Sequence, residues 1–330
     1  MSRILPVFLF MLCTLCLKGQ DLHYSMFFNS PLNLSPGLTG VYNGDQRYHA
    51  NYRQQWYQWP VGFQSFDIGA DYKFRSEDKD NFFGLGALIN YDVAGDLDVK
   101  YTGFDVFGSY SIKLGSGFLT PGVNIGMGFR GFDSSNALLG EFWNGTVATP
   151  GPANDPLYLG NNTDNITFVD LNAGLNYRFQ KSFRKHLDLG LSLGNILGAS
   201  QVFNASANYE ADQFRKLNAY GMANWELGSK FDLLLNALGS FQGPYQEIVL
   251  NAQGKIYLSD EYTTALYLGA GIRLDDAWYP MIAIQYNKFY AAFSYDIDIK
   301  DVNKGGGPEF AVRYIIASPP IAGRRPCPIY

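Results

Sequence analysis

Apolar and polar residues alternate along most of this chain, in segments of about ten residues. The alternation is clearest over residues 102–114, and it recurs over 119–131 and 169–179. In the first segment the apolar face holds Phe104, Val106, Ile112 and Leu114, and the other face holds Asp105, Ser109, Ser111 and Lys113. Because a β-strand sends successive side chains to opposite faces, the pattern predicts strands with one apolar face.

The same reasoning predicts an all-β chain of about 14 antiparallel strands. They cover 48–56, 65–73, 82–93, 97–114, 118–132, 166–179, 187–194, 216–227, 231–242, 246–258, 264–274, 277–286, 288–298 and 308–317. An even number is typical of a bacterial membrane barrel whose two ends lie on the same side.

Alternation alone also fits a soluble barrel or sandwich, in which the apolar face turns inward. After residue 19 no apolar run approaches the ~20 residues of a transmembrane helix. A chain of this kind that crosses a membrane must therefore form a closed barrel, since an open sheet would leave backbone groups unpaired in lipid.

Three features favour the membrane barrel. Charges occur deep within strands on the polar face, which suits a hydrated or hydrogen-bonded lumen: Asp105, Arg130, Asp170, Arg178, Arg273 and Arg313. The chain has 25 Phe and 23 Tyr, and many lie near strand ends, as in aromatic girdles. Long connections at 133–165 and 195–215 follow odd-numbered strands, whereas short turns at 115–117 and 228–230 follow even ones. We therefore expect a transmembrane up-and-down β-barrel in the outer membrane.

The two ends of the chain are predicted to lie outside this barrel. Residues 1–19 have Arg3 followed by an apolar stretch, which is typical of a secretory signal peptide. A lipoprotein signal is the alternative, but Cys13 and Cys16 are each preceded by Leu rather than by Gly or Ala. With the barrel at 48–317, residues 20–47 and the tail 318–330 are expected in the periplasm.

Composition excludes several other functions. Loss of Arg3 and Lys18 with the signal takes the formal charge from −5 to −7, which argues against nucleic acid as a partner. Only Cys327 would then remain, so neither a disulfide framework nor a cysteine metal site is expected. No phosphate-binding, dinucleotide or paired-histidine motif is present, and His49 fits a polar lumen better than a catalytic group. We expect no cofactor and no enzyme activity.

Residues 30–40 are too rich in Pro and Gly for a strand and too apolar for a free tail. Two interpretations remain open: a plug that packs into or under the barrel mouth, or a periplasmic docking surface. The candidate docking residues are Phe27, Pro31, Leu32, Leu34, Pro36 and Leu38, together with Cys327 in the tail.

The same segment carries a family resemblance. Residues 20–40, Asn43-Gly44-Asp45, Tyr52-Arg53-Gln54-Gln55-Trp56 and the tail Arg325-Pro326-Cys327-Pro328 resemble the PorP/SprF membrane proteins of the type IX secretion system. Ser35-Pro36-Gly37 departs mildly from the Asn-Pro-Ala that is usual in that family.

The resemblance implies a non-enzymatic outer-membrane component of type IX secretion, and of gliding in some members. Its expected partners are other secretion components or a secreted adhesin, besides outer-membrane lipid. It also implies one of two roles, anchoring of periplasmic machinery or reception of the C-terminal domains of adhesins, and the sequence does not separate them. A channel or transporter for small solutes is the alternative function, because a polar lumen also permits one.

The predicted topology can be tested with epitope tags. Because long loops and chain ends lie on opposite sides of such a barrel, a tag within 133–165 should bind antibody on intact cells. A tag at the C-terminus should bind antibody only after the outer membrane is permeabilised. The reverse labelling would contradict the topology.

Overall fold

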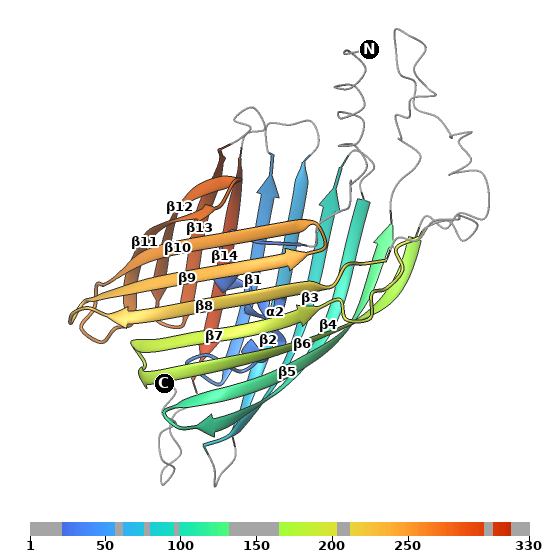
Figure 1. Cartoon of the computed structure of the whole chain (residues 1–330). Helices are drawn as coiled ribbons and strands as arrows, with labels where there is room; N and C mark the ends of the chain where they lie inside the picture. The colour runs from blue at the N-terminus through green and yellow to red at the C-terminus, as the bar shows by residue number, and fades with distance from the viewer. Residues whose placement is uncertain are drawn as a thin grey trace, which may run out of the picture.

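The chain forms one closed β-barrel in a computed structural model (Figure 1). The structure describes residues 22–56, 62–75, 80–95, 99–131, 165–202, 212–299 and 306–317. The strands of these parts are β1 (Gln46–Gln55), β2 (Phe63–Arg75), β3 (Phe82–Ala94), β4 (Val99–Leu114), β5 (Gly117–Gly131), β6 (Asn165–Ser182), β7 (Lys185–Gly194), β8 (Lys216–Glu226), β9 (Phe231–Gln242), β10 (Tyr245–Tyr257), β11 (Thr264–Arg273), β12 (Ala277–Tyr286), β13 (Phe289–Asp298) and β14 (Gly307–Ile316).

Each strand pairs antiparallel with the next, and β1 pairs with β14 to close the barrel. Gln46 lies opposite Ile316 and Arg53 lies opposite Glu309, so the closing pair is in register over most of β1. Closure leaves neither edge strand unpaired, as a sheet in lipid requires. The prediction of a 14-stranded up-and-down barrel is confirmed, and the predicted strand ends differ from those observed by at most three residues.

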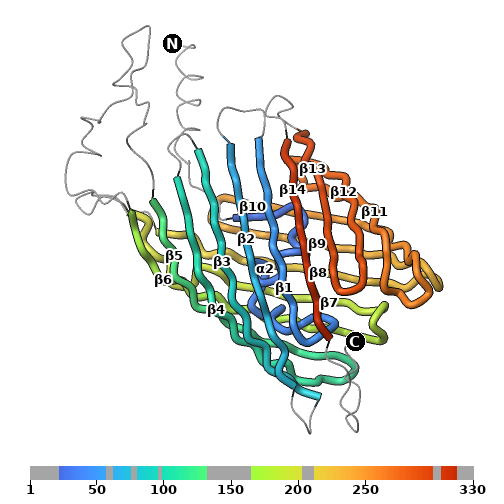
Figure 2. Tube along the Cα trace, turned by 180° about the vertical axis from the view of Figure 1, so that it is seen from behind, coloured from blue at the N-terminus to red at the C-terminus, as the bar shows by residue number. Residues whose placement is uncertain are grey.

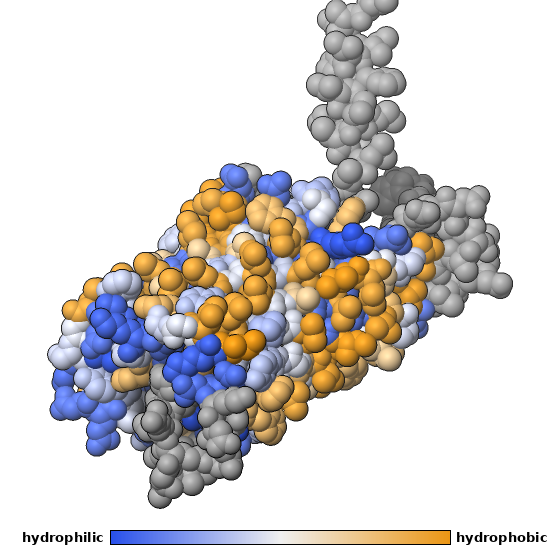
Figure 3. Space-filling view, turned by 60° about the horizontal axis from the view of Figure 1, so that its bottom comes forward, coloured by the Kyte–Doolittle hydropathy of each residue, from blue (hydrophilic) through white to orange (hydrophobic). Residues whose placement is uncertain are grey.

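The two faces of the wall also match the alternating pattern. Val106 and Ile125 point outward and are 62% and 58% exposed, whereas Asp67 and Asp71 point into the lumen and are fully buried. Apolar residues cover much of the outer wall in Figure 3, and hydrophilic residues gather toward its ends. An outward apolar surface is unfavourable in water and favourable against acyl chains, so the wall is built for a bilayer.

The barrel has two distinguishable ends. We call the end where β1 begins and β14 ends the proximal end, and the opposite one the distal end. The predicted long loop at 133–165 leaves the distal end of β5, but 132–164 fall outside the described residues, as do the predicted signal peptide and the tail 318–330.

A non-strand segment, residues 22–45, lies inside the barrel; we call it the lumenal segment. It contains three short helical turns, η2 (Phe27–Asn29), α2 (Pro31–Leu34) and η3 (Pro36–Leu38). Figures 1 and 2 both place α2 inside the barrel, enclosed by the strands. None of the helices in the described parts has the length and apolar character needed to cross a membrane.

A charged substitution should impair assembly of the barrel much more on the outer face of the wall than on the lumenal face. Leu235 is 46% exposed on the outer face of β9, and its neighbour Asn236 faces the lumen. Leu235→Arg places a charge among acyl chains and should destabilise the assembled barrel by ~2–4 kcal/mol if the site lies near the midplane. Asn236→Arg is the matched control and should assemble far better. Heat-modifiable mobility of membrane fractions on gels measures assembly; equal assembly of both variants would contradict the face assignment.

Candidate functional site

The lumenal segment begins at a distal anchor on β14. Both carboxylate oxygens of Glu309 accept backbone N–H groups, from Ser25 and Met26, each at 2.8 Å. All three residues are almost completely buried. A buried carboxylate is costly unless its oxygens are hydrogen-bonded, and a buried backbone N–H is costly without an acceptor. At this point the carboxylate of the wall and the backbone N–H groups of the segment therefore satisfy each other's hydrogen-bonding needs.

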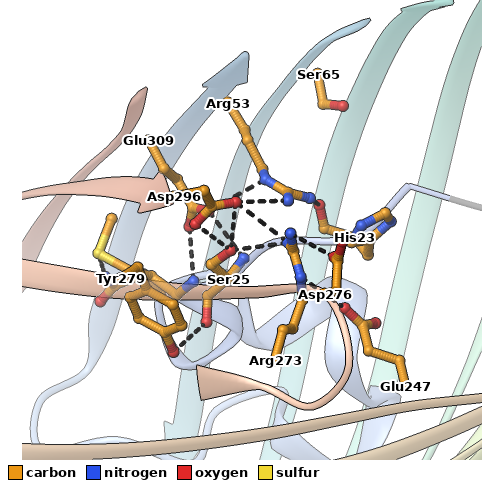
Figure 4. Close-up of polar contacts among 12 residues, drawn as sticks. His23, Ser25, Arg53, Ser65, Glu247, Arg273, Asp276, Tyr279, Asp296 and Glu309 are labelled. Atoms are coloured by element: carbon orange, nitrogen blue, oxygen red, sulfur yellow. Dashed lines mark hydrogen bonds and ion pairs between the residues drawn. The ribbon is translucent and has the colours of Figure 1, made fainter. Parts of the chain in front are cut away.

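Further charges converge on Ser25 (Figure 4). The Ser25 hydroxyl donates to Asp296 at 2.8 Å and accepts from Arg273 at 3.0 Å, and its carbonyl accepts from the Tyr279 hydroxyl at 2.8 Å. Arg53 links the wall to the lumenal segment, because it donates to Asp296 of the wall and to the His23 carbonyl of the segment, each at 2.8 Å. This cluster holds the start of the segment at the distal end.

Asp67 of β2 forms a middle anchor. It accepts hydrogen bonds from the Ser30 hydroxyl at 2.7 Å and from the Asn51 amide at 2.8 Å. Beside it, the side-chain amides of Asn33 and Asn90 exchange two hydrogen bonds of 2.9 and 3.0 Å. Ser30 directly precedes Pro31, so this anchor fixes the start of the α2 turn.

A proximal anchor centres on Asp71, also on β2. Arg47 of β1 contacts both of its carboxylate oxygens at 2.8 Å, and the Gly40 N–H donates to it at 2.7 Å. Arg47 also donates to the Leu38 carbonyl, and Lys73 donates to the Tyr42 carbonyl at 2.6 Å. A bidentate guanidinium–carboxylate pair fixes geometry strongly, so the end of the segment is held firmly before β1 begins.

Between these anchors the segment approaches β5 and β6 unusually closely. Gly122 and Gly174 face each other across these strands, and a side chain on either would collide with Ser35-Pro36-Gly37. A Cβ on Gly37 would in turn lie 2.9 Å from the Asn176 nitrogen. Position 37 is Gly here, where the Asn-Pro-Ala motif has Ala, and the wall leaves no room for the methyl group of Ala at this position.

The structure places the described docking candidates inside the lumen. Each is buried, and four of them are at most 5% exposed: Phe27, Leu32, Leu34 and Leu38. Leu32 packs with Leu88 and Phe107 of the wall, and the other three join a cluster that reaches β8–β14. Pro31 and Pro36 start the α2 and η3 turns. Cys327 lies outside the described residues. A docking role for any of these residues stays a prediction.

The structure describes residues 22–45 of the predicted N-terminal segment inside the lumen, and the membrane side that this segment faces stays a prediction. Residues 22–45 run from the distal to the proximal end within the lumen. The physical reason lies in the hydrogen-bonding groups. Short turns leave N–H and C=O groups without intrahelical partners, and the charged lumen supplies those partners.

Two lumenal cavities flank the segment and share no lining residue. One, of about 130 Å³, lies toward the distal end and is lined by Leu32, Asn33 and polar wall residues such as Asp105 and Arg130. The other, of about 420 Å³, lies toward the proximal end and is lined by Phe28, Pro31, Leu38 and wall residues. The lumenal segment thus lies between them.

Sequence reasoning missed the wall residues that hold the segment: Arg47, Arg53, Asp67, Asp71, Asp296 and Glu309. A signal was available, because charged and other polar residues recur at alternate, inward positions of β1 and β2. His49 is buried near Asp67 at 3.8 Å, which places it in this polar layer. Within the described ranges, no group of three or more His, Cys, Asp or Glu could hold a metal ion.

The family comparison covers most of the chain. A family model described as "Type IX secretion system membrane protein PorP/SprF" matches residues 17–314. No match was found among curated proteins.

Solved structures are similar in fold at low sequence identity. The chain is similar to a FadL homologue of Pseudomonas aeruginosa, with 12% identity, a TM-score of 0.51, and coverage of 81% of this chain and 89% of that chain. It is similar to the toluene transporter TodX of P. putida, with 9% identity, a TM-score of 0.49, and coverage of 88% and 94%. At such identities the likeness concerns the barrel fold alone.

The distal anchor predicts a local loss of order. Glu309→Ala leaves the N–H groups of Ser25 and Met26 without acceptors, at a cost of about 1–3 kcal/mol each in a buried site. Amide hydrogen exchange over residues 22–34 should accelerate while the wall strands stay protected. Glu247→Ala is the control for a lost carboxylate, because Glu247 pairs with Arg273 at 3.8 Å and forms no hydrogen bond or ion pair with the described segment. Unchanged exchange in Glu309→Ala would contradict the anchor.

Proposed function

The chain belongs to the PorP/SprF family of type IX secretion system membrane proteins, and we propose that it serves secretion by binding protein partners rather than by conducting solutes. The observation that carries this proposal is the lumenal segment, which is anchored at the distal end, the middle and the proximal end. A barrel of this fold resides in the outer membrane, and its interior can be an open channel or can be plugged. The anchors favour the plugged state.

The hydrogen bonds between the segment and the buried carboxylates of the wall make a freely mobile plug unfavourable. Withdrawal of the segment would leave Asp67, Asp71 and Glu309 without the partners that the segment supplies. A buried carboxylate that loses its partners is strongly destabilising. Opening therefore costs free energy, which the binding of a partner can offset.

If the lumen is plugged, partner proteins bind at the two ends of the barrel. We assign the proximal end to the periplasm and the distal end, with the connection over 132–164, to the cell surface, as long and short connections are arranged in outer-membrane barrels. A partner at the proximal end would be a periplasmic secretion component. A partner at the distal end would be the C-terminal domain of a secreted adhesin. Family membership supports association with the secretion machinery, and both partner assignments are part of the proposal.

The alternative is a transporter for small solutes. It would require a continuous path through the lumen, and the segment lies between the two cavities described above. Toluene transport is a property of TodX, and the likeness between TodX and this chain concerns the fold alone. The type IX family match supports the secretion role more directly.

The proposal predicts a secretion defect with partner loss. A strain that carries the chain with residues 24–40 deleted, in a barrel that still assembles, should retain type IX cargo in the periplasm. Affinity purification after cross-linking should recover secretion components or an adhesin with the intact chain and fewer with the deletion. Quantitative mass spectrometry of both fractions provides the measurement.

A strain with Glu247→Ala is the control and should secrete normally, because that residue forms no hydrogen bond or ion pair with the described segment. Normal secretion and an unchanged set of partners in a well-assembled deletion strain would contradict a role of the segment in partner binding. Normal secretion in a strain that lacks the whole chain would contradict the secretion role itself.

A further inference from the structure

The larger lumenal cavity lies at the proximal end of the barrel. Its volume is about 420 Å³, within the range of pockets that hold small ligands or side chains. The turns that follow β6, β10 and β12 contribute Phe183, Tyr262 and Lys288 to its lining, and the end of β14 contributes Ile315 and Ala317. These residues all belong to one end of the barrel, so the cavity faces the proximal side.

The cavity is lined by more cationic side chains than form ion pairs with carboxylates of the wall. Arg47 and Arg178 also line it, but each forms an ion pair, with Asp71 and Asp188 respectively. Lys255 and Arg313 line it as well, and among the described residues neither has a carboxylate within ion-pair distance.

The acidic residue paired with Lys255 on the neighbouring strand has other hydrogen-bond partners. Asp232, opposite Lys255 on β9, accepts from Arg184 at 2.6 Å and from the Tyr257 hydroxyl at 3.0 Å. Lys255 instead donates to the Gln285 side-chain oxygen at 3.1 Å. Lys255 is only 9% exposed, so its ammonium group sits beside neutral partners in a buried position. A buried cation of this kind favours an anionic partner.

Aromatic rings surround the two cations. Lys255 lies 4.5 Å from the ring centroid of Tyr257 and 5.1 Å from that of Tyr267, and Arg313 lies 4.5 Å from that of Tyr290. Tyr267 and Tyr290 contact each other edge to face, with centroids 5.3 Å apart. Such contacts orient the cations, and the three rings line the cavity beside them. The cavity is thus both cationic and aromatic.

We propose that this cavity binds an acidic polypeptide segment with aromatic residues, whose carboxylates would reach Lys255 and Arg313. The proposal rests on the proposed function, in which proteins are the partners. The chain's own tail fits poorly, because residues 318–330 contain Arg324 and Arg325 and neither Asp nor Glu. A bilayer lipid fits poorly as well, because the lining consists of lumenal and turn residues rather than the outward wall.

Titration calorimetry on the intact barrel in a neutral detergent tests this directly. The probe is a capped hexapeptide of alternating Glu and Tyr, and the same peptide with Gln in place of Glu measures the contribution of charge. We expect the acidic peptide to bind, with an affinity that falls as salt rises. In the double variant Lys255→Gln and Arg313→Gln the dissociation constant should rise roughly tenfold or more, because two charge-assisted contacts are lost.

Arg130→Gln is the matched control: it removes a lumenal cation from the other cavity and should leave binding unchanged. Absent binding by the intact barrel, equal binding of the Gln peptide, or equal binding by the double variant would each overturn the proposal. So would much tighter binding after deletion of residues 318–330, which would assign the cavity to the tail. If the double variant does not assemble, the comparison of the two peptides on the intact barrel decides alone. The titration needs no secretion, so its failure is separate from a failure of the export test.

Discussion

Charge buried on the inner face of the wall is the constraint on which the rest of this structure depends. Asp67, Asp71 and Glu309 are each at most 1% exposed, and every one accepts a hydrogen bond from the lumenal segment. The dependence is mutual, because the segment's short turns leave backbone groups that the polar wall helps to satisfy. The outer apolar face places the barrel in lipid, and the inner charged face determines that the barrel is filled.

The strands could be predicted because each one is marked by the alternation of its own consecutive residues. A period of two with one apolar face marks a strand wherever it occurs, and the fourteen observed strands follow that pattern closely. The largest difference is at β6, which continues to Ser182 beyond the predicted end at 179, where the pairing with β7 shifts register between Gln180 and Ser182. Such a shift depends on a neighbouring strand, and a linear pattern does not contain it.

The site was only partly predictable for the same reason. Phe27, Leu32, Leu34 and Leu38 stood out as apolar residues that need cover, and the structure buries them. Their cover could not be identified from local pattern, because the contact of Ser25 with Glu309 joins positions 284 residues apart. Closure of the barrel brings β14 beside β1 and creates the distal anchor. A linear pattern contains neither this closure nor the position of residues 22–45 inside the barrel.

Ion conductance in planar bilayers tests the central claim most directly, since the claim is that the lumenal segment closes the barrel. The intact barrel should carry no steady current, because its segment is held at three anchors and separates the two cavities. A barrel without residues 24–40 should conduct steadily, which would show that the wall itself encloses a pore. A steady current through the intact barrel, equal to that of the deletion, would contradict the account.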